Sequence, residues 1–326
     1  MFMLHSCALS NVTLKHILLG VPSLRLSPVN NFLHSLFSQV DVFFNQKLVS
    51  PQSNTYPYRA YIENTLNYES TAKNTHLTAG LYYPQSPGAF DDITKSIASG
   101  NAGDLASSIK HGRILDLIGP LHCDVFNQEK YLLNGVDMQL RLVRSKDNFC
   151  LMQSGTGDYR VHITEATLLV RKVKISPMIL LAHAKALAQT PAKYPITRVE
   201  VKSLSIPGGI QRETLDNVFI GQLPKRIIVS FVTNKTFNGA PAKNPFNFQH
   251  FNMNNLSLYI DGVQIPSRAL QPAYDKELSV RNYYTLFMGT GIHYGNTGNG
   301  IGRTEYNPFN FQHFNMNNLS FYIDGV

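Results

Sequence analysis

Alternation of apolar and polar side chains along short segments is the feature that most constrains how this chain can fold. In FSQVDVFF, for example, Val40, Val42 and Phe44 share one face. Gln39 and Asp41 lie on the opposite face. A period of two residues is that of a strand with one buried face. The same period predicts six further strands, at 115–125, 136–144, 166–175, 197–206, 225–232 and 255–265.

The last of these segments carries a hairpin signal. Leu256, Leu258 and Ile260 alternate up to the pair Asp261-Gly262. A type I′ turn needs positive φ at both central residues, and Asp-Gly meets that need. We therefore predict a tight hairpin at this pair.

One segment breaks the strand pattern and predicts a helix. Ser176 suits a helix N-cap, Pro177 suits the first helical position, and Pro191 stops the helix. Between them Ala, Leu and Lys are good helix formers. We therefore predict a helical connector over 176–195.

Other segments predict a second helix and two loops. A short helix is expected within 54–68, starting after Pro57. The stretches 84–110 and 288–306 are rich in Gly, Ser, Asn and Thr and are expected to form long loops.

A block of strands, a helical connector and a second block of strands indicate an all-β chain. The length of 326 residues suits about two domains. The chain is 43% hydrophobic and 15% charged, which allows a packed core. Phe and Tyr total 35 and Gly and Pro total 39, which favours strands and turns. Many short antiparallel strands favour a sandwich or jelly roll in each half.

The chain is mildly basic. Lys and Arg exceed Asp and Glu by eight, yet the longest basic stretch is VRKVK at 170–174, where the charges alternate as on a strand. This pattern predicts a weak, sequence-independent attraction to nucleic acid rather than the reading of bases.

Cysteine usage and hydropathy predict a soluble, intracellular protein. Cys7, Cys123 and Cys150 lack metal-ligand spacing and cannot all pair, which suits a reducing compartment. The apolar stretch 16–21 is far shorter than the ~20 residues of a membrane span, and it lacks the context of a signal peptide.

The sequence contains no motif that predicts catalysis. The glycine-rich stretch 289–302 has Tyr294 where a dinucleotide-binding fingerprint needs glycine. His183 has no second metal ligand at helical spacing, and His122 is expected at the surface or partly covered, opposite an apolar strand face. The adjacent carboxylates at 91–92 are expected to be solvated. We therefore predict that the protein is not an enzyme, with no catalytic, cofactor-binding or metal-binding residues and no cofactor.

A near-perfect repeat closes the sequence. NPFNFQHFNMNNLSLYIDGV at 244–263 returns at 307–326 with a single difference, Leu258 against Phe321. Repeat architectures bury each unit on its neighbours and usually have three or more diverging copies. Two nearly identical copies, without similarity on either side of them, indicate a recent duplication or a gene-assembly fault.

Seven long stretches carry a resemblance to a known family. They are PVNNFLHSLFSQVDV (28–42), SNTYPYRAYIENTLNY (53–68), RLVRSKDNFCLM (141–152), LVRKVKISPMILLAHAKAL (169–187), AKYPITRVEVKSLSIP (192–207), IGQLPKRIIVSFV (220–232) and NPFNFQHFNMNNLSLYIDGVQIPSRALQP (244–272). In this order they resemble the major capsid proteins of Polinton (Maverick) elements and of the related adintoviruses. The resemblance covers about residues 27–306.

The resemblance implies a double jelly roll, with an incomplete first jelly roll at 27–175, the connector at 176–195 and a second jelly roll at 196–306. It implies a structural role, without catalysis or cofactor, in homotrimeric pseudo-hexagonal capsomers of a virus-like transposable element. The partners it implies are further copies of the chain in a capsid lattice, a penton-type minor capsid protein and, non-specifically, DNA; no membrane is expected. The expected location is the virion or the host nucleus or cytoplasm, without secretion.

Both ends of the sequence depart from the family pattern. Residues 1–26 do not align with it, and the copy at 307–326 stands where family members continue into closing strands. We therefore expect a degraded copy of such a capsid gene.

Two other functions compete with this one. The first is a jelly-roll module that binds carbohydrate or protein, for which TYPYRAY at 55–61 is the candidate aromatic surface. The second is a jelly-roll enzyme, which needs metal-binding histidines clustered on neighbouring strands.

Overall fold

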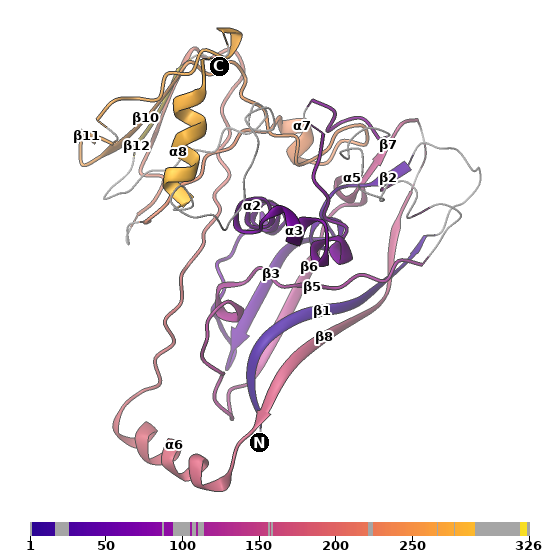
Figure 1. Ribbon diagram of the computed structural model, residues 1–326, viewed down its shortest axis with the longest axis vertical. Helices are drawn as coiled ribbons and strands as arrows, with labels where there is room; N and C mark the ends of the chain where they lie inside the picture. The colour runs from indigo at the N-terminus through magenta and orange to yellow at the C-terminus, as the bar shows by residue number, and fades with distance from the viewer. Residues whose placement is uncertain are drawn as a thin grey trace.

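The structure is a computed structural model in which two β-containing parts are joined by a long connection (Figure 1). It describes residues 2–16, 26–86, 88–93, 105, 109, 114–155, 157, 159–220, 224–265, 267–276, 278–290 and 320–324, with the main chain alone in 2–16 and 320–324. Of the predicted segments, the rest of 1–25, most of 94–113, the loop beyond Thr290 and most of the copy at 307–326 lie outside the described residues.

The strands are short apart from two. They are β1 (Phe2–His16), β2 (Leu26–Pro28), β3 (Phe37–Phe44), β4 (Lys47–Leu48), β5 (Gly119–Pro120), β6 (Met138–Arg144), β7 (Leu151–Gln153), β8 (Val161–Lys174), β9 (Arg212–Asp216), β10 (Asn255–Ile260), β11 (Val263–Gln264) and β12 (Ser320–Asp324).

Three helices are longer than ten residues. The α-helices are α1 (Phe32–Ser35), α2 (Tyr56–Asn67), α3 (Ser70–Lys73), α5 (Asp147–Cys150), α6 (Pro177–Gln189), α7 (Asn234–Phe237) and α8 (Val280–Thr290), and the 3-10 turns are η1 (His76–Gly80), η3 (Asp124–Phe126) and η4 (Tyr274–Lys276). Helix α8 is absent from the sequence prediction, and the loop expected from residue 288 is wrong for 288–290.

All the strand pairs between these elements are antiparallel. In the larger part, β1 lies between β5 and β8, β3 lies between β4 and β6, and β2 pairs with β7. Strands β1 and β8 run side by side as long curved ribbons (Figure 1). In the smaller part the order is β11-β10-β12-β9. The prediction of antiparallel strands is confirmed in part: β3, β6 and β8 fall within or around their predicted segments.

The predicted hairpin is confirmed in the smaller part. Strands β10 and β11 pair with Ile260 opposite Val263, so Asp261 and Gly262 are the two turn residues. Their φ angles are 48° and 79°, and positive φ at both positions is the requirement of a type I′ turn.

Three predicted strands are wrong. Only two residues of 115–125 form a strand, and the last two residues of the segment lie in η3. The predicted alternation is not kept in the structure, since Cys123 is buried on one side and His122 and Asp124 are buried on the other. The segments 197–206 and 225–232 form no strand ladder within the described residues. In the first of them, side chains of the larger part take the place of a neighbouring strand as hydrogen-bond partners.

Helix α6 confirms that the segment predicted at 176–195 contains a helix. The Ser176 side chain accepts a hydrogen bond from the Ile179 N–H at 3.5 Å, as an N-cap does, and the helix ends before Pro191. No side chain of α6 is buried. The helix projects from the body at the far end of β8, and a long extended segment returns from it to the smaller part (Figure 1).

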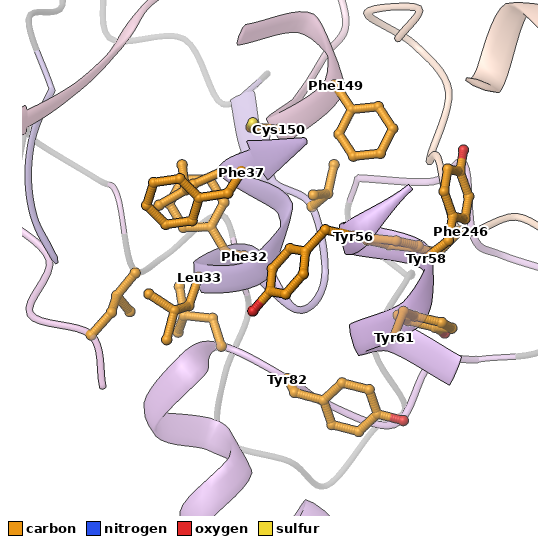
Figure 2. Close-up of a cluster of buried hydrophobic side chains, with 14 of the residues drawn as sticks. Phe32, Leu33, Phe37, Tyr56, Tyr58, Tyr61, Tyr82, Phe149, Cys150 and Phe246 are labelled. Carbon is orange, nitrogen blue, oxygen red and sulfur yellow. The ribbon is translucent and has the colours of Figure 1, made fainter. Parts of the chain in front are cut away.

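The core consists of one large and one small cluster. The large cluster packs around α1, α2 and β3 and includes Phe32, Leu33 and Phe37 together with aromatic residues from distant segments (Figure 2). The small cluster lies around β10 in the smaller part and is formed by Val218, Ile227, Met253, Leu256, Leu258, Ile260 and Leu270. Most of the apolar burial therefore lies in the larger part, where α2 is central.

Candidate functional site

Helix α2 is the element at which the two parts of the chain meet. Pro57 occupies its first turn, where the missing N–H costs no hydrogen bond, and the predicted helix at 54–68 is confirmed. Tyr58 and Tyr61 lie three residues apart and share one face of the helix. Arg59 and Glu63 lie four residues apart on another face. The helix therefore presents an aromatic face and a polar face, and each of them contacts a different segment from beyond the connector.

The aromatic face of α2 is covered by the second half of the chain. The Tyr61 and Phe246 rings are stacked, with centroids 4.3 Å apart and an interplanar angle of 5°. The Tyr58 ring is stacked on Phe237 with centroids 5.6 Å apart. It also meets the Phe149 ring edge to face, with centroids 5.9 Å apart (Figure 2). Aromatic pairs of this kind contribute roughly 0.5–1.5 kcal/mol each beyond their buried area. The burial of TYPYRAY also removes it as an exposed aromatic surface.

Asn244 holds in place the segment that carries Phe246. Its N–H donates to Asp91 Oδ1 at 2.9 Å, and its side-chain amide donates to the Phe90 carbonyl at 3.1 Å. Its own Oδ1 accepts from the Phe246 N–H at 2.9 Å. Asp91 also pairs with Lys243 at 2.8 Å, so the expectation that this carboxylate is merely solvated is wrong. The opening residues of the first repeat copy are thus built into the main core.

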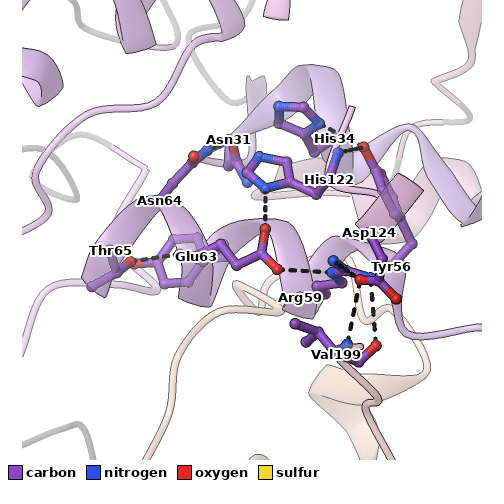
Figure 3. Close-up of polar contacts among 11 residues, drawn as sticks. Asn31, His34, Tyr56, Arg59, Glu63, Asn64, Thr65, His122, Asp124 and Val199 are labelled. Carbon is purple, nitrogen blue, oxygen red and sulfur yellow. Dashed lines mark hydrogen bonds and ion pairs between the residues drawn. The ribbon is translucent and has the colours of Figure 1, made fainter. Parts of the chain in front are cut away.

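The polar face of α2 holds a chain of charged groups (Figure 3). Arg59 Nε pairs with Glu63 Oε1 at 2.8 Å, and Arg59 Nη2 pairs with Asp124 Oδ1 at 2.6 Å. Glu63 Oε2 also accepts a hydrogen bond from His122 Nδ1 at 2.6 Å. All four side chains are at least 85% covered, with exposures of 9%, 15%, 3% and 5% in the order Arg59, Glu63, Asp124 and His122. A buried network of this kind is stable only while every charge keeps its partner.

The same network forms hydrogen bonds to the segment that follows the connector. The Val199 N–H donates to Asp124 Oδ1 at 3.3 Å, and Arg59 Nη1 donates to the Val199 carbonyl at 3.5 Å. The Val201 carbonyl accepts from the Ser53 hydroxyl at 3.2 Å and the Thr55 hydroxyl at 3.4 Å. These bonds occupy the main-chain groups that a neighbouring strand would otherwise use. They explain why 197–206 is extended without joining a sheet.

Ionisation in the cluster follows from burial and neighbours. Burial alone would raise the pKa of Glu63, but the hydrogen bond from His122 and the charge of Arg59 outweigh it and lower that pKa. Burial alone would lower the pKa of Arg59, but the carboxylates of Glu63 and Asp124 outweigh it and raise that pKa. Arg59 and Glu63 therefore stay charged as a pair.

His34 completes the cluster as a neutral group. Its Nδ1 lies 3.0 Å from the Tyr56 hydroxyl, and its ring meets that of His122 edge to face, with centroids 4.7 Å apart. Burial, together with the charge that His122 can carry, lowers the pKa of His34 well below its ordinary value. Burial likewise raises the pKa of Tyr56, so its hydroxyl stays protonated.

The space beside the cluster is small. A cavity of about 30 Å³ is lined by Tyr56, Arg59, His122 and neighbouring residues, which is room for about one water molecule. His122 Nε2 is buried and has no hydrogen-bond partner among the described residues, so it is the atom that such a water would satisfy. The arrangement suits a structural junction between two halves of a chain, because its charged side chains bond mainly to one another.

The other candidate residues of the sequence lie apart from this junction. His122 was expected at the surface or partly covered; it is buried, because α2 covers the face opposite the apolar one. His183 lies partly exposed on α6, and His250 is stacked on Tyr274 at 4.0 Å. Within the described residues, no three His, Cys, Asp or Glu side chains are placed to hold a metal ion. No helix in the same part of the chain is long and apolar enough to cross a membrane.

Known proteins are similar to this chain by sequence and by fold. No family model matches the chain. An uncharacterized protein of Caenorhabditis elegans, F54H12.2, is 24% identical over 267 residues, which is 81% of this chain and 61% of that protein. The chain thus spans about three fifths of the length of this curated relative. A chain in the 3.5 Å cryo-EM structure of the Sputnik virophage matches all of this chain and 72% of its own length, with a TM-score of 0.50 and 11% identity. At that identity the likeness shows a shared fold.

Proposed function

We propose that the protein is a structural capsid protein of a virus-like element. The observation that carries the proposal is the fold shared along the whole chain with a chain from a virophage structure. The collinear stretches that resemble Polinton and adintovirus capsid proteins point the same way, and they include 53–68, which contains α2. The protein acts by assembling, and no catalytic step or cofactor is part of its role.

The finer proposal is a double jelly roll whose three copies form a pseudo-hexagonal capsomer. The junction at α2 supports it, because Tyr61 with Phe246 and Asp124 with Val199 bind the two β-containing parts into one unit. Helix α6 supports it as well, since Met178 and Leu181 are 78% and 62% exposed there. Large apolar side chains in such a position are expected to be covered by a neighbouring subunit.

The partners proposed for this role are further copies of the chain in a lattice and a penton-type minor capsid protein. DNA is proposed as a non-specific partner, because the exposed basic residues attract phosphate without reading bases. The proposed location is the virion, with assembly in the nucleus or cytoplasm of the host cell. The duplication of 244–263 supports the further proposal that this is a degraded copy, whose shells form less readily.

The test is the assembly state of the purified full-length chain. We expect trimers by light scattering and ring-shaped capsomers by negative-stain electron microscopy. A chain that stays monomeric and binds glycans on an array would contradict the proposal in favour of a binding module. Stoichiometric metal in the purified protein, lost together with a hydrolytic or oxidative activity, would contradict it in favour of an enzyme.

A matched comparison tests the degraded state separately. The chain is expressed beside a version whose residues 307–326 are replaced by the closing strands of a related capsid protein. We expect more closed particles from the second version. Equal yields of closed particles would contradict the degraded state and leave the capsid role in place.

A further inference from the structure

Strand β12 is part of the second repeat copy, and it pairs with the first copy. Ser320–Asp324 repeats Ser257–Asp261 with one difference, Phe321 in place of Leu258. In the sheet, β12 lies between β10 and β9 and is antiparallel to both. The two nearly identical segments are therefore neighbours in one ladder.

The register of this ladder has local two-fold symmetry. Leu258 lies opposite Phe321, which is the same position of the repeat. On either side, Ser257 lies opposite Tyr322 and Tyr259 lies opposite Ser320. Tyr322 repeats Tyr259 and Ser320 repeats Ser257, so both pairs join the same two repeat positions with the strands exchanged. The two-fold axis passes between Leu258 and Phe321.

Symmetry of this kind makes the segment complementary to itself. A strand that pairs with its own copy about a two-fold axis makes the same contacts whether the copy belongs to its own chain or to another one. We infer that two molecules of this protein exchange β12, so that β12 of each pairs with β10 of the other in the register seen within one chain. The partner is a second copy of the chain, and the product is a strand-exchanged dimer.

The surroundings of β10 give the exchange a driving force. Leu256 and Leu258 are fully buried and Ile260 is 4% exposed, so this strand is the centre of the small core. An edge of β10 left without β12 would present unpaired N–H and C=O groups beside that core, which favours recapture of a strand.

Exchange is measured with the full-length chain. Unlabelled and 15N-labelled chains are unfolded, mixed and refolded by dilution, and native mass spectrometry counts mixed dimers. Phe321→Pro places a proline between two strands, where it removes a ladder hydrogen bond, and is expected to lower the mixed-dimer fraction at least tenfold. Phe321→Leu, which makes the two copies identical, is the matched control and is expected to keep that fraction.

A peptide tests the same strand position without relying on a variant. The segment 317–325, added in excess during refolding of the wild-type chain, is expected to compete with β12 and to lower the dimer fraction at least tenfold. The same peptide with Tyr322→Pro is expected to leave the fraction unchanged. Equal dimer fractions with both peptides, or a wild-type chain that forms no mixed dimers, would overturn the inference.

This inference stands apart from the proposed function. Trimeric capsomers without mixed dimers would overturn the exchange and keep the capsid role. Mixed dimers that depend on Phe321 but never form capsomers would overturn the capsid role and keep the exchange.

Discussion

Asp124 is the single residue on which the junction between the two halves depends most. Its Oδ1 accepts from Arg59 of α2 and from the Val199 N–H beyond the connector, and its side chain is 3% exposed. Removing a charge from a buried pair leaves the partner uncompensated, which costs more than the pair contributes when intact.

We expect Asp124→Asn to lower the free energy of unfolding by about 3 kcal/mol, because Arg59 then keeps Glu63 as its one carboxylate partner among those described. Urea titration followed by circular dichroism measures the change. Lys243→Gln is the control: it removes a pair whose lysine side chain is 50% exposed, and is expected to change stability by less than about 1 kcal/mol. Equal losses in the two variants would contradict the role given to Asp124.

His34 predicts how stability depends on pH. Its pKa is lowered in the folded chain, so below pH ~6.5 the unfolded chain binds a proton that the folded chain does not. Stability is therefore full above pH ~6.5 and falls as the pH drops toward the folded pKa. Glu63, whose pKa is also lowered, acts in a separate and more acidic window, below its ordinary value of 4.5.

We expect His34→Gln to reduce the loss of stability between pH 7.5 and pH 5.5 by about 1 kcal/mol, the linkage free energy of one proton over one pH unit below the ordinary histidine pKa. Urea midpoints at the two pH values measure it. His183→Gln, on the partly exposed histidine of α6, is expected to leave the loss unchanged. Burial lowers the pKa of His250 as well, so His250→Gln is also expected to reduce the loss of stability between the two pH values. A wild-type chain with equal stability at both pH values would contradict the prediction.

Single residues also mark the limit of what the sequence predicts. Arg59 and Glu63 are four apart, a spacing that predicts their pairing on a helix. Asp124 and His122 lie 65 and 59 residues from their partners on α2, and no local pattern reports such a contact. Alternation placed His122 at the surface or partly covered because it describes only one sheet face. It carries no information on a helix that covers the other face.

At the scale of elements, α6 is well formed but poorly covered. Met178, Ile179, Leu181 and Leu187 are all more than 40% exposed, and no residue of the helix is buried. The helix is apolar on most sides, a pattern typical of helices that are covered in the working state of a protein.

We expect Leu181→Asp to leave the stability of the monomer within about 0.5 kcal/mol of wild type, because the side chain is 62% exposed. The same change is expected to abolish trimers, since a charge would enter the apolar contact between subunits. Light scattering measures the trimer fraction and urea titration the stability. Gln189→Asp, at the end of the same helix, is the control and is expected to keep the trimers. Intact trimers in Leu181→Asp would exclude α6 from the subunit contact.

Elements marked by capping or turn residues could be predicted from the sequence. Elements that depend on contacts with a distant segment could not. Ser176, Pro177 and Pro191 were sufficient for α6, and Asp261-Gly262 was sufficient for the hairpin, because caps and turns depend on neighbouring residues in the chain. The segment 197–206 alternates as well as β3 does. It is not a strand in the structure, because its main chain bonds to side chains instead of to a strand.

At the scale of the whole molecule, positive charge is concentrated in one stretch of the chain. Residues 160–202 carry eight Lys and Arg against two Glu, which is six of the net eight positive charges of the chain. This stretch includes all of β8 and all of α6, and the lysines and arginines in it are exposed. Non-specific DNA binding, if it occurs by phosphate contact, is therefore expected in this stretch.

We expect the affinity for duplex DNA of arbitrary sequence to fall steeply with salt. The triple variant Arg171→Gln, Lys174→Gln, Lys185→Gln is expected to flatten the dependence of log Kd on log salt by about 2–3, near 0.9 for each lost phosphate contact. Fluorescence anisotropy across a salt series measures the slope. The control variant Lys47→Gln, Lys235→Gln, Arg268→Gln removes the same charge elsewhere and is expected to keep it. Binding that does not change with salt would contradict phosphate contact.

The extended stretch at 197–206 has a consequence for how the protein behaves in heavy water. Its amides from residue 202 to 205 belong to exposed residues outside any sheet, so they should take up deuterium in the free chain far faster than those of β3 or β8. If a neighbouring molecule supplies the missing strand during assembly, uptake in this stretch should slow while that of the small core stays constant. Peptide-resolved mass spectrometry would then trace the order in which subunit contacts form.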